Sequence, residues 1–185
     1  MVTGDKRPRF HCAIPLFALL ALNIFAQNVD EYQLKAAFLY NFAKFVDWPP
    51  GSFKSDNDPI RICVLGQDPF GAALVSMVKG KTILGRPLEI INVPGISPAV
   101  NCRMLFVGSS EKKGVRAVLA QVPPIGVLTV GETQGFASQG GVINFNMEDG
   151  RIRLEINVGA ALQAKLRISS QLLSLAQIVK TGKGQ

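Results

Sequence analysis

Short apolar segments that alternate with helical patterns are the feature that most limits the folds open to this chain. The apolar segments with the length of strands are Ile60–Gly66, Leu88–Val93, Met104–Val107 and Gly126–Val130. A helical pattern follows the first of them as far as Val78, and another covers Glu111–Gln121. Strands that alternate with helices predict an α/β layered fold with a largely parallel central sheet and flanking helices.

The pattern changes after Gly131. Two apolar segments, Val142–Met147 and Ile152–Ile156, flank Asp149 and Gly150, a dipeptide typical of tight hairpin turns. Apolar and polar side chains alternate along the second segment, which is typical of a strand with one buried face. We therefore predict a C-terminal antiparallel hairpin. Beyond it, Ser169 is expected to cap a final helix, whose apolar side carries Ile168, Leu172, Leu175 and Val179.

The segment Tyr32–Trp48 predicts a helix that Pro49 and Pro50 end. A capping box at Asp30 and Gln33 marks its start. The apolar arc of this helix is wider than one stripe, because Leu39, Tyr40, Ala43 and Val46 extend it. A helix of this kind is covered on two sides, so we expect either a symmetric dimer or a second helix of the same chain against it.

The N-terminus has the layout of a secretory signal peptide. Basic residues at Lys6, Arg7 and Arg9 precede the apolar stretch Ala13–Phe25, and Ala26 offers a small residue for cleavage. The alternative is a membrane anchor, but about 13 apolar residues make a helix of about 20 Å, short of the roughly 30 Å hydrocarbon core. We expect residues 1–26 to be removed and residues 27–185 to form one exported domain.

Removing the leader limits the chemistry of the mature chain. The only histidine of the sequence, His11, leaves with it, and so does Cys12. Histidine-based catalysis and histidine-bound metals are then excluded, and we expect no catalytic residue, no metal, no cofactor and no enzymatic activity. Cys63 and Cys102 remain. An even number of cysteines in an exported protein suggests a disulfide, and two buried free thiols are the alternative.

The basic charge does not indicate nucleic acid. The net charge is +7, but lysine and arginine are scattered along the chain and no basic, aromatic nucleic-acid motif is present. One local concentration consists of Arg151, Arg153, Lys165 and Arg167 near Glu155. These side chains could hold an anionic ligand or an acidic partner, or they could serve solubility alone.

Three segments together resemble one family. They are the run Leu34–Pro49 (LKAAFLYNFAKFVDWP), the pair CVLG at Cys63–Gly66 and DPFG at Asp68–Gly71, and the run Ile168–Ala176 (ISSQLLSLA). With these runs, the chain resembles the YfiR/HmsC-like periplasmic proteins over essentially the whole of residues 27–185.

The resemblance implies a periplasmic α/β domain, often dimeric, that represses a membrane-bound diguanylate cyclase or another membrane signalling enzyme by binding its periplasmic domain. Such a protein restrains cyclic-di-GMP signalling and biofilm formation. Cys63 and Cys102 match one disulfide of the family. A second disulfide of some members has no counterpart, because Ala137 and Asn144 stand in that loop.

The resemblance also implies that partner-contacting residues lie between Glu155 and Arg167. There, charged residues flank small ones, which would let a partner approach closely. The predicted partner-binding residues are Arg153, Glu155, Ala160, Ala161, Ala164 and Arg167. In the alternative interpretation the alanines pack internally. A second function stays open, that of a periplasmic sensor that binds a small anionic or aromatic compound near Arg167.

Overall fold

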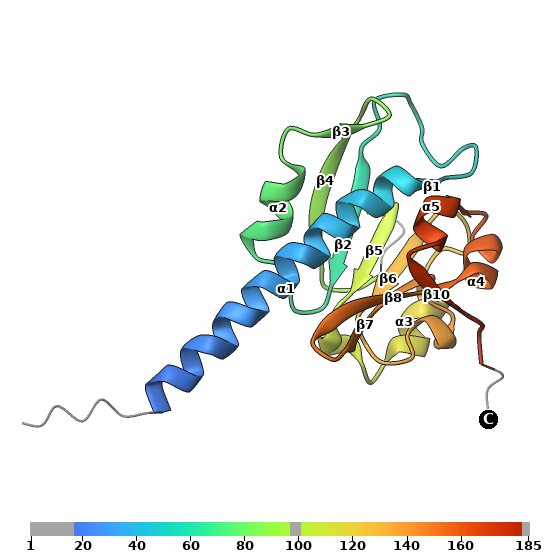
Figure 1. Cartoon of the computed structure of the whole chain (residues 1–185). Coiled ribbons are helices and arrows are strands. Elements are labelled where there is room, and N and C mark those ends of the chain that lie inside the picture. Colours follow the sequence, from blue (N-terminus) through green and yellow to red (C-terminus); the bar gives the residue numbers. More distant parts are fainter. Residues whose placement is uncertain (1–16, 97–100, 183–185) are drawn as a thin grey trace, which may run out of the picture.

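The computed structural model describes residues 17–96 and 101–182, with side chains described from residue 31 onward (Figure 1). Residues 1–16 of the predicted signal peptide lie outside the described residues, and residues 17–26 begin the first helix. Among the described residues, no helix combines the length and the hydropathy that crossing a bilayer requires.

An eight-stranded mixed sheet forms the centre of the fold, with the strand order β10-β8-β7-β6-β5-β2-β4-β3. Its strands are β2 (Ile60–Leu65), β3 (Thr82–Ile83), β4 (Arg86–Val93), β5 (Met104–Val107), β6 (Leu128–Gly131), β7 (Ile143–Glu148), β8 (Arg151–Asn157) and β10 (Ala176–Val179). Neighbouring strands are parallel except in the pairs β7–β8 and β3–β4. The predicted α/β fold with a largely parallel sheet is therefore confirmed.

Helices cover both faces of this sheet. On one face lie α1 (Phe17–Phe45), α2 (Ala72–Val78), α4 (Val158–Gln163) and α5 (Ser170–Leu173), which share one apolar core with the sheet. On the other face lie α3 (Val115–Gln121) and the 3-10 turn η3 (Ala137–Gln139), over a second, smaller core. In Figure 1, α1 crosses the first face diagonally and α3 lies behind the sheet.

Helix α1 is longer than the sequence predicted. It begins at Phe17 and not at the expected capping box, so Asp30 lies inside it. The chain from Phe17 to Trp48 contains neither glycine nor proline, and therefore nothing local interrupts the helix. The helix ends where Val46 and Asp47 form β1, which pairs with β9 (Arg167–Ile168).

The wide apolar arc of α1 is covered by the same chain. Leu39, Ala43 and Val46 are buried in the core beneath α1, and the ring of Phe42 stacks on Phe145 of β7 at 5.7 Å. The core of the same chain thus packs against this arc. The width of the arc is therefore no longer a reason to expect a dimer. A homodimer stays a prediction.

The C-terminal region confirms the hairpin and corrects the final helix. Asp149 and Gly150 both have positive φ, as a tight turn between β7 and β8 requires. Ser169 does cap a helix, since its Oγ accepts a bond from the Leu172 N–H at 3.3 Å. That helix, α5, ends at Leu173, and Val179 belongs to β10, which pairs in parallel with β8. The open edge of β8 supplies hydrogen-bond partners that a longer helix would leave unused.

Candidate functional site

Three parallel strands end at one edge of the sheet, and polar residues follow each of them. Gln67 and Asp68 follow β2, Ser109 follows β5 and Glu132 follows β6. The strand order reverses between β2 and β5, because β4 lies on one side of β2 and β5 on the other. In open α/β sheets, ligands bind outside the carboxyl ends of the strands at such a reversal. This edge is therefore the candidate site.

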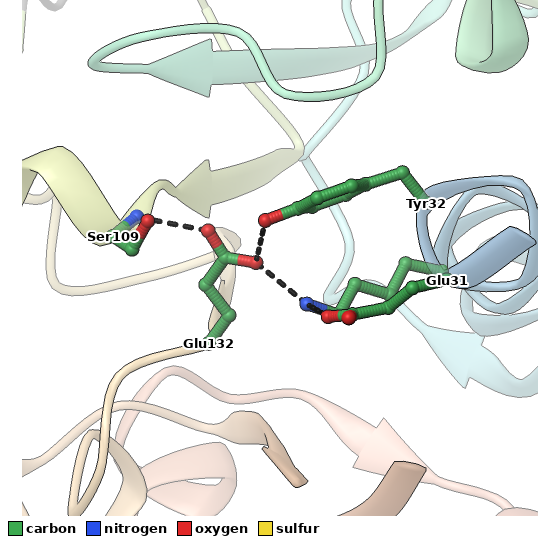
Figure 2. Close-up of polar contacts among 5 residues, drawn as sticks. Glu31, Tyr32, Ser109 and Glu132 are labelled. Atoms are coloured by element: carbon green, nitrogen blue, oxygen red, sulfur yellow. Dashed lines mark hydrogen bonds and ion pairs between the residues drawn. The ribbon is translucent and has the colours of Figure 1, made fainter. Parts of the chain in front are cut away.

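Glu132 is the centre of a polar network at this edge (Figure 2). Its Oε2 accepts hydrogen bonds from the Lys35 ammonium at 2.7 Å and from the Tyr32 hydroxyl at 3.1 Å. Its Oε1 accepts a bond from the backbone N–H of Ser109 at 2.9 Å. The carboxylate is only 3% exposed, so these three donors replace the water that would otherwise solvate its charge.

Lys35 neutralises two carboxylates. Its side chain is also 3% exposed, and its ammonium contacts Glu31 at 2.5 Å in addition to Glu132. The ammonium lies 4.5 Å from the centre of the Tyr32 ring, which adds a cation–π contact. A buried pair of this kind is destabilised strongly when one partner is removed, because the other charge is left uncompensated.

Tyr32 acts in this network as a hydrogen-bond donor. Burial, together with the negative charge of Glu132, raises the pKa of its phenol far above the ordinary value. The phenol therefore keeps its proton at neutral pH. Tyr32 also places the edge of its ring against Phe70, at 5.6 Å between ring centres, so it links the polar network to the apolar core.

A polar crevice opens beside the network. It has a volume of about 450 Å³ and is lined by Tyr32, Gln67, Asp68, Pro69, Ser109, Ser110 and Lys112. Asp68 accepts bonds from the Phe70 N–H at 2.8 Å and from Asn92 at 3.2 Å. Its carboxylate is therefore partly occupied, whereas Lys112 brings a cation to the opening.

Gly66 lets the two strand ends approach one another. It has a φ of +90°, and a Cβ at this position would lie 2.2 Å from Ser110 Oγ. Ser110 Oγ in turn accepts a bond from the Gln67 N–H at 3.0 Å. The conformation needs glycine for both reasons. Gly66, the last residue of the CVLG motif, is thus explained by the geometry of the crevice.

Polar and charged groups gather at the opening of the crevice. Among the residues that the structure describes, no group of three or more histidine, cysteine or acidic side chains could hold a metal ion. Lysine, serine and amide groups at the opening can bind polar or charged groups by hydrogen bonds and by charge.

The two cysteines predicted to pair do so in the structure. Cys63 of β2 and Cys102 form a disulfide, with 5.8 Å between their Cα atoms. Cys63 is fully buried in the smaller core, and Cys102 packs against that core. The alternative of two free thiols is not what the structure shows.

The predicted partner-binding residues are divided between core and surface. Ala160 and Ala161 are 6% and 2% exposed and lie in the main core, as in the alternative interpretation of internal packing, while Ala164 is half-buried against it. Asn157 caps their helix, because its Oδ1 accepts a bond from the Ala160 N–H at 2.9 Å. Buried alanines of this kind present little surface to a partner.

The charged members of that set are not gathered in one place. Arg153 is exposed on β8 and Glu155 is half-buried on the same side of that strand, where it accepts a bond from Asn144 at 3.0 Å. Arg167 is exposed on β9, opposite Asp47 in the separate two-stranded sheet. Their contact with a partner stays a prediction.

Sequence reasoning missed the network of Tyr32, Lys35, Ser109 and Glu132. One signal was available, since Ser109 and Glu132 are polar residues within two positions of the ends of apolar strands. Lys35 stood out only as a charge within an apolar helix, and nothing local indicated its partner 97 residues away.

Comparison with known proteins adds a family and two distant structures. Residues 32–177 match the family model described as YfiR/HmsC-like. An ABC domain in complex with L-Trp from Streptococcus pneumonia is similar to the chain with a TM-score of 0.46 and 12% identity, over 64% of this chain and 55% of that one. A conserved domain protein from Vibrio cholerae gives a TM-score of 0.47 and 14% identity, over 65% and 55%. The chain spans about half the length of these structures, and no curated protein matches it.

Proposed function

Because this chain belongs to the YfiR/HmsC-like family of periplasmic regulators of diguanylate cyclase, we propose that it represses a membrane-bound diguanylate cyclase. It does so by binding the periplasmic domain of that enzyme, or of a related membrane signalling enzyme. The result is a restraint on cyclic-di-GMP signalling and on biofilm formation. The protein itself acts as a regulator and carries out no reaction, as is general in the family.

The observation that carries this proposal is the extent of the family match. It covers residues 32–177, which include every strand of the central sheet except the last two residues of β10. The family resemblance therefore concerns the whole folded domain and not a short motif. The polar and charged groups that line the crevice at the carboxyl edge agree with a protein that works by binding.

Export of the chain is part of the same proposal. Residues 1–26 act as a signal peptide that is cleaved near Ala26, and residues 27–185 work in the periplasm. The disulfide between Cys63 and Cys102 supports this location, because disulfides persist in oxidising compartments such as the periplasm.

Exposed charges help to orient the partner. Of the residues predicted to contact it, Arg153 and Arg167 are exposed and can act in this way. Charges at the rim of an interface set orientation and encounter rate more than affinity. We keep a homodimer in the proposal as the form that meets the partner.

A second candidate function is the sensing of a small anionic or aromatic compound. The observation that favours it is the polar crevice at the strand reversal, with Lys112 at its opening and Tyr32 on its wall. The sequence placed such a ligand near Arg167, and the crevice is a different location. Binding there could regulate the repressor.

Deletion of the gene tests the main proposal. We expect cellular cyclic-di-GMP and surface attachment to rise in the deletion strain, and both to return to the original level when the full-length gene is restored. A second strain that expresses residues 27–185 without a leader is the control, and it should not restore repression. Unchanged cyclic-di-GMP and attachment in the deletion strain would contradict the proposal.

A further inference from the structure

The second feature of the carboxyl edge is a groove between α1 and α2. The two helices lie side by side on one face of the sheet (Figure 1), and the groove between them has a volume of about 1190 Å³. It adjoins the polar crevice, because Tyr32, Gln67 and Pro69 line both. This volume is above the roughly 300–1,000 Å³ that is usual for small-molecule pockets, so the groove has room for a polypeptide segment.

The floor of the groove is apolar and fixed in place. Phe70 is buried and meets the ring of Phe106 edge-on at 4.7 Å, and Tyr32 meets Phe70 edge-on in turn. The Glu132 network holds Tyr32 from the other side. A rigid aromatic floor loses little entropy when a partner covers it.

The wall on the α2 side allows close approach. Ala73 and Ser76 are small, and Met77 is half-buried and flexible enough to adapt to a partner. An amphipathic helix placed in a groove of this kind buries its apolar face against two existing helices. The groove between the two helices therefore offers a largely apolar surface to such a partner helix.

The charges around the groove select the partner. Lys81 lines it, with its ammonium 4.5 Å from the centre of the Tyr40 ring, and Lys44 lies over the same ring at 4.3 Å. Lys112 and Asp68 both line the adjoining crevice. Of the described residues that line the groove, none is acidic. An occupant with acidic side chains beside its apolar face complements this distribution.

We propose that the groove between α1 and α2 binds an amphipathic helix with an acidic flank, supplied by the periplasmic part of the membrane partner. This inference rests on the proposed function and names the contact through which it acts. A second copy of the chain suits the groove less well, because residues 27–185 of each copy carry a net charge of +5 and the groove favours an acidic occupant.

Site-specific photocrosslinking tests the proposal in cells that express the full-length gene. A photoreactive phenylalanine analogue replaces either Ser76, which lines the groove, or Val75, its neighbour on α2 that is 51% exposed and does not line it. We expect crosslinks from position 76 only. Mass spectrometry of the crosslinked peptide should show an amphipathic segment with acidic residues from the periplasmic part of a membrane protein.

Charge reversal provides the second measurement. Lys81→Glu should lower the crosslinking yield from position 76 about tenfold. The matched control, Lys79→Glu, changes an exposed lysine that does not line the groove and should leave the yield unchanged. Melting temperatures of the purified variants show that each one folds.

Several results would overturn the proposal. These are equal crosslinking from positions 75 and 76, no crosslink at all, or a crosslinked peptide from a second copy of this chain. An equal yield in Lys81→Glu and Lys79→Glu would do the same. The cyclic-di-GMP level of the deletion strain tests the proposed function separately. If the protein represses the cyclase but its partner binds elsewhere, cyclic-di-GMP rises in the deletion strain while the crosslinking results contradict the groove.

Discussion

At the scale of single residues, Glu132 joins three segments that are far apart in the sequence. It binds Lys35 and Tyr32 of α1 and the backbone of Ser109 after β5. Each contact satisfies a polar group that is withdrawn from water, and together they fix α1 at the carboxyl edge. Both the crevice and the groove therefore depend on a few buried polar atoms.

Removing the cation of this network should destabilise the fold. We expect Lys35→Met to lower the free energy of unfolding by about 3–5 kcal/mol, because it leaves the Glu132 carboxylate buried without its counter-charge. Urea unfolding followed by circular dichroism measures this change. Lys44→Met is the control on the same helix, where the lysine is exposed, and it should change the value by less than about 0.5 kcal/mol. Equal losses in both variants would contradict the role of Lys35.

The sequence could not reveal this network, for a physical reason. Ser109 and Glu132 are single polar residues at strand ends, and such residues occur at many strand ends without a role. Their importance arises from the strand order, which brings β5 and β6 together beneath α1. Cys63 and Cys102 were easier to predict, because a disulfide follows from cysteine number and compartment.

At the scale of elements, predictions succeeded where burial produces a strong pattern. The strands β2, β5 and β6 are largely buried on both faces and appear as mostly apolar runs. The hairpin was recognisable from its turn. The edge strand β10 was not, because it has only four residues, two of them exposed, and its hydrogen bonds come from the distant β8. In the sequence, the apolar pattern of a short helix followed by such a strand resembles the pattern of one longer helix.

A pair of glycines encloses the ring of Phe136 in the loop between β6 and β7. A Cβ on Gly131 would lie 2.3 Å from this ring, and one on Gly141 would lie 2.1 Å from it. We expect Gly131→Ala to lower the free energy of unfolding by about 1–3 kcal/mol, because the buried ring must shift. The control is Gly95→Ala, where a Cβ would meet nothing within 4 Å. Chemical denaturation of both variants compares them, and equal stability would contradict the packing described for Phe136.

At the scale of the whole molecule, the sheet separates two cores that are stabilised differently. The larger core lies under α1. The smaller core lies on the α3 side and contains the disulfide, which joins the middle of β2 to the segment before β5. The surface that we propose for the partner lies on the α1 side. The disulfide therefore supports the domain from the face opposite the groove.

Loss of the disulfide should weaken the domain as a whole. The bond closes a loop with a sequence separation of 39, for which chain entropy gives a stabilisation of about 4 kcal/mol. We expect the double variant Cys63→Ala, Cys102→Ala to lose free energy of unfolding on this order. Urea unfolding with and without reductant measures the loss. Reductant should lower the free energy of unfolding of the original protein and leave that of the variant unchanged. If reductant does not change the stability of the original protein, the prediction is wrong.

The mature protein is proposed to act on a membrane enzyme from the periplasmic side. Adding purified residues 27–185 to spheroplasts of the deletion strain tests this claim directly, because the added protein meets only the outer surface of the inner membrane. Cyclic-di-GMP is then measured inside the spheroplasts. We predict that its level falls with added protein and not with the same amount of heat-denatured protein. A level that stays the same at saturating amounts of folded protein would contradict the claim.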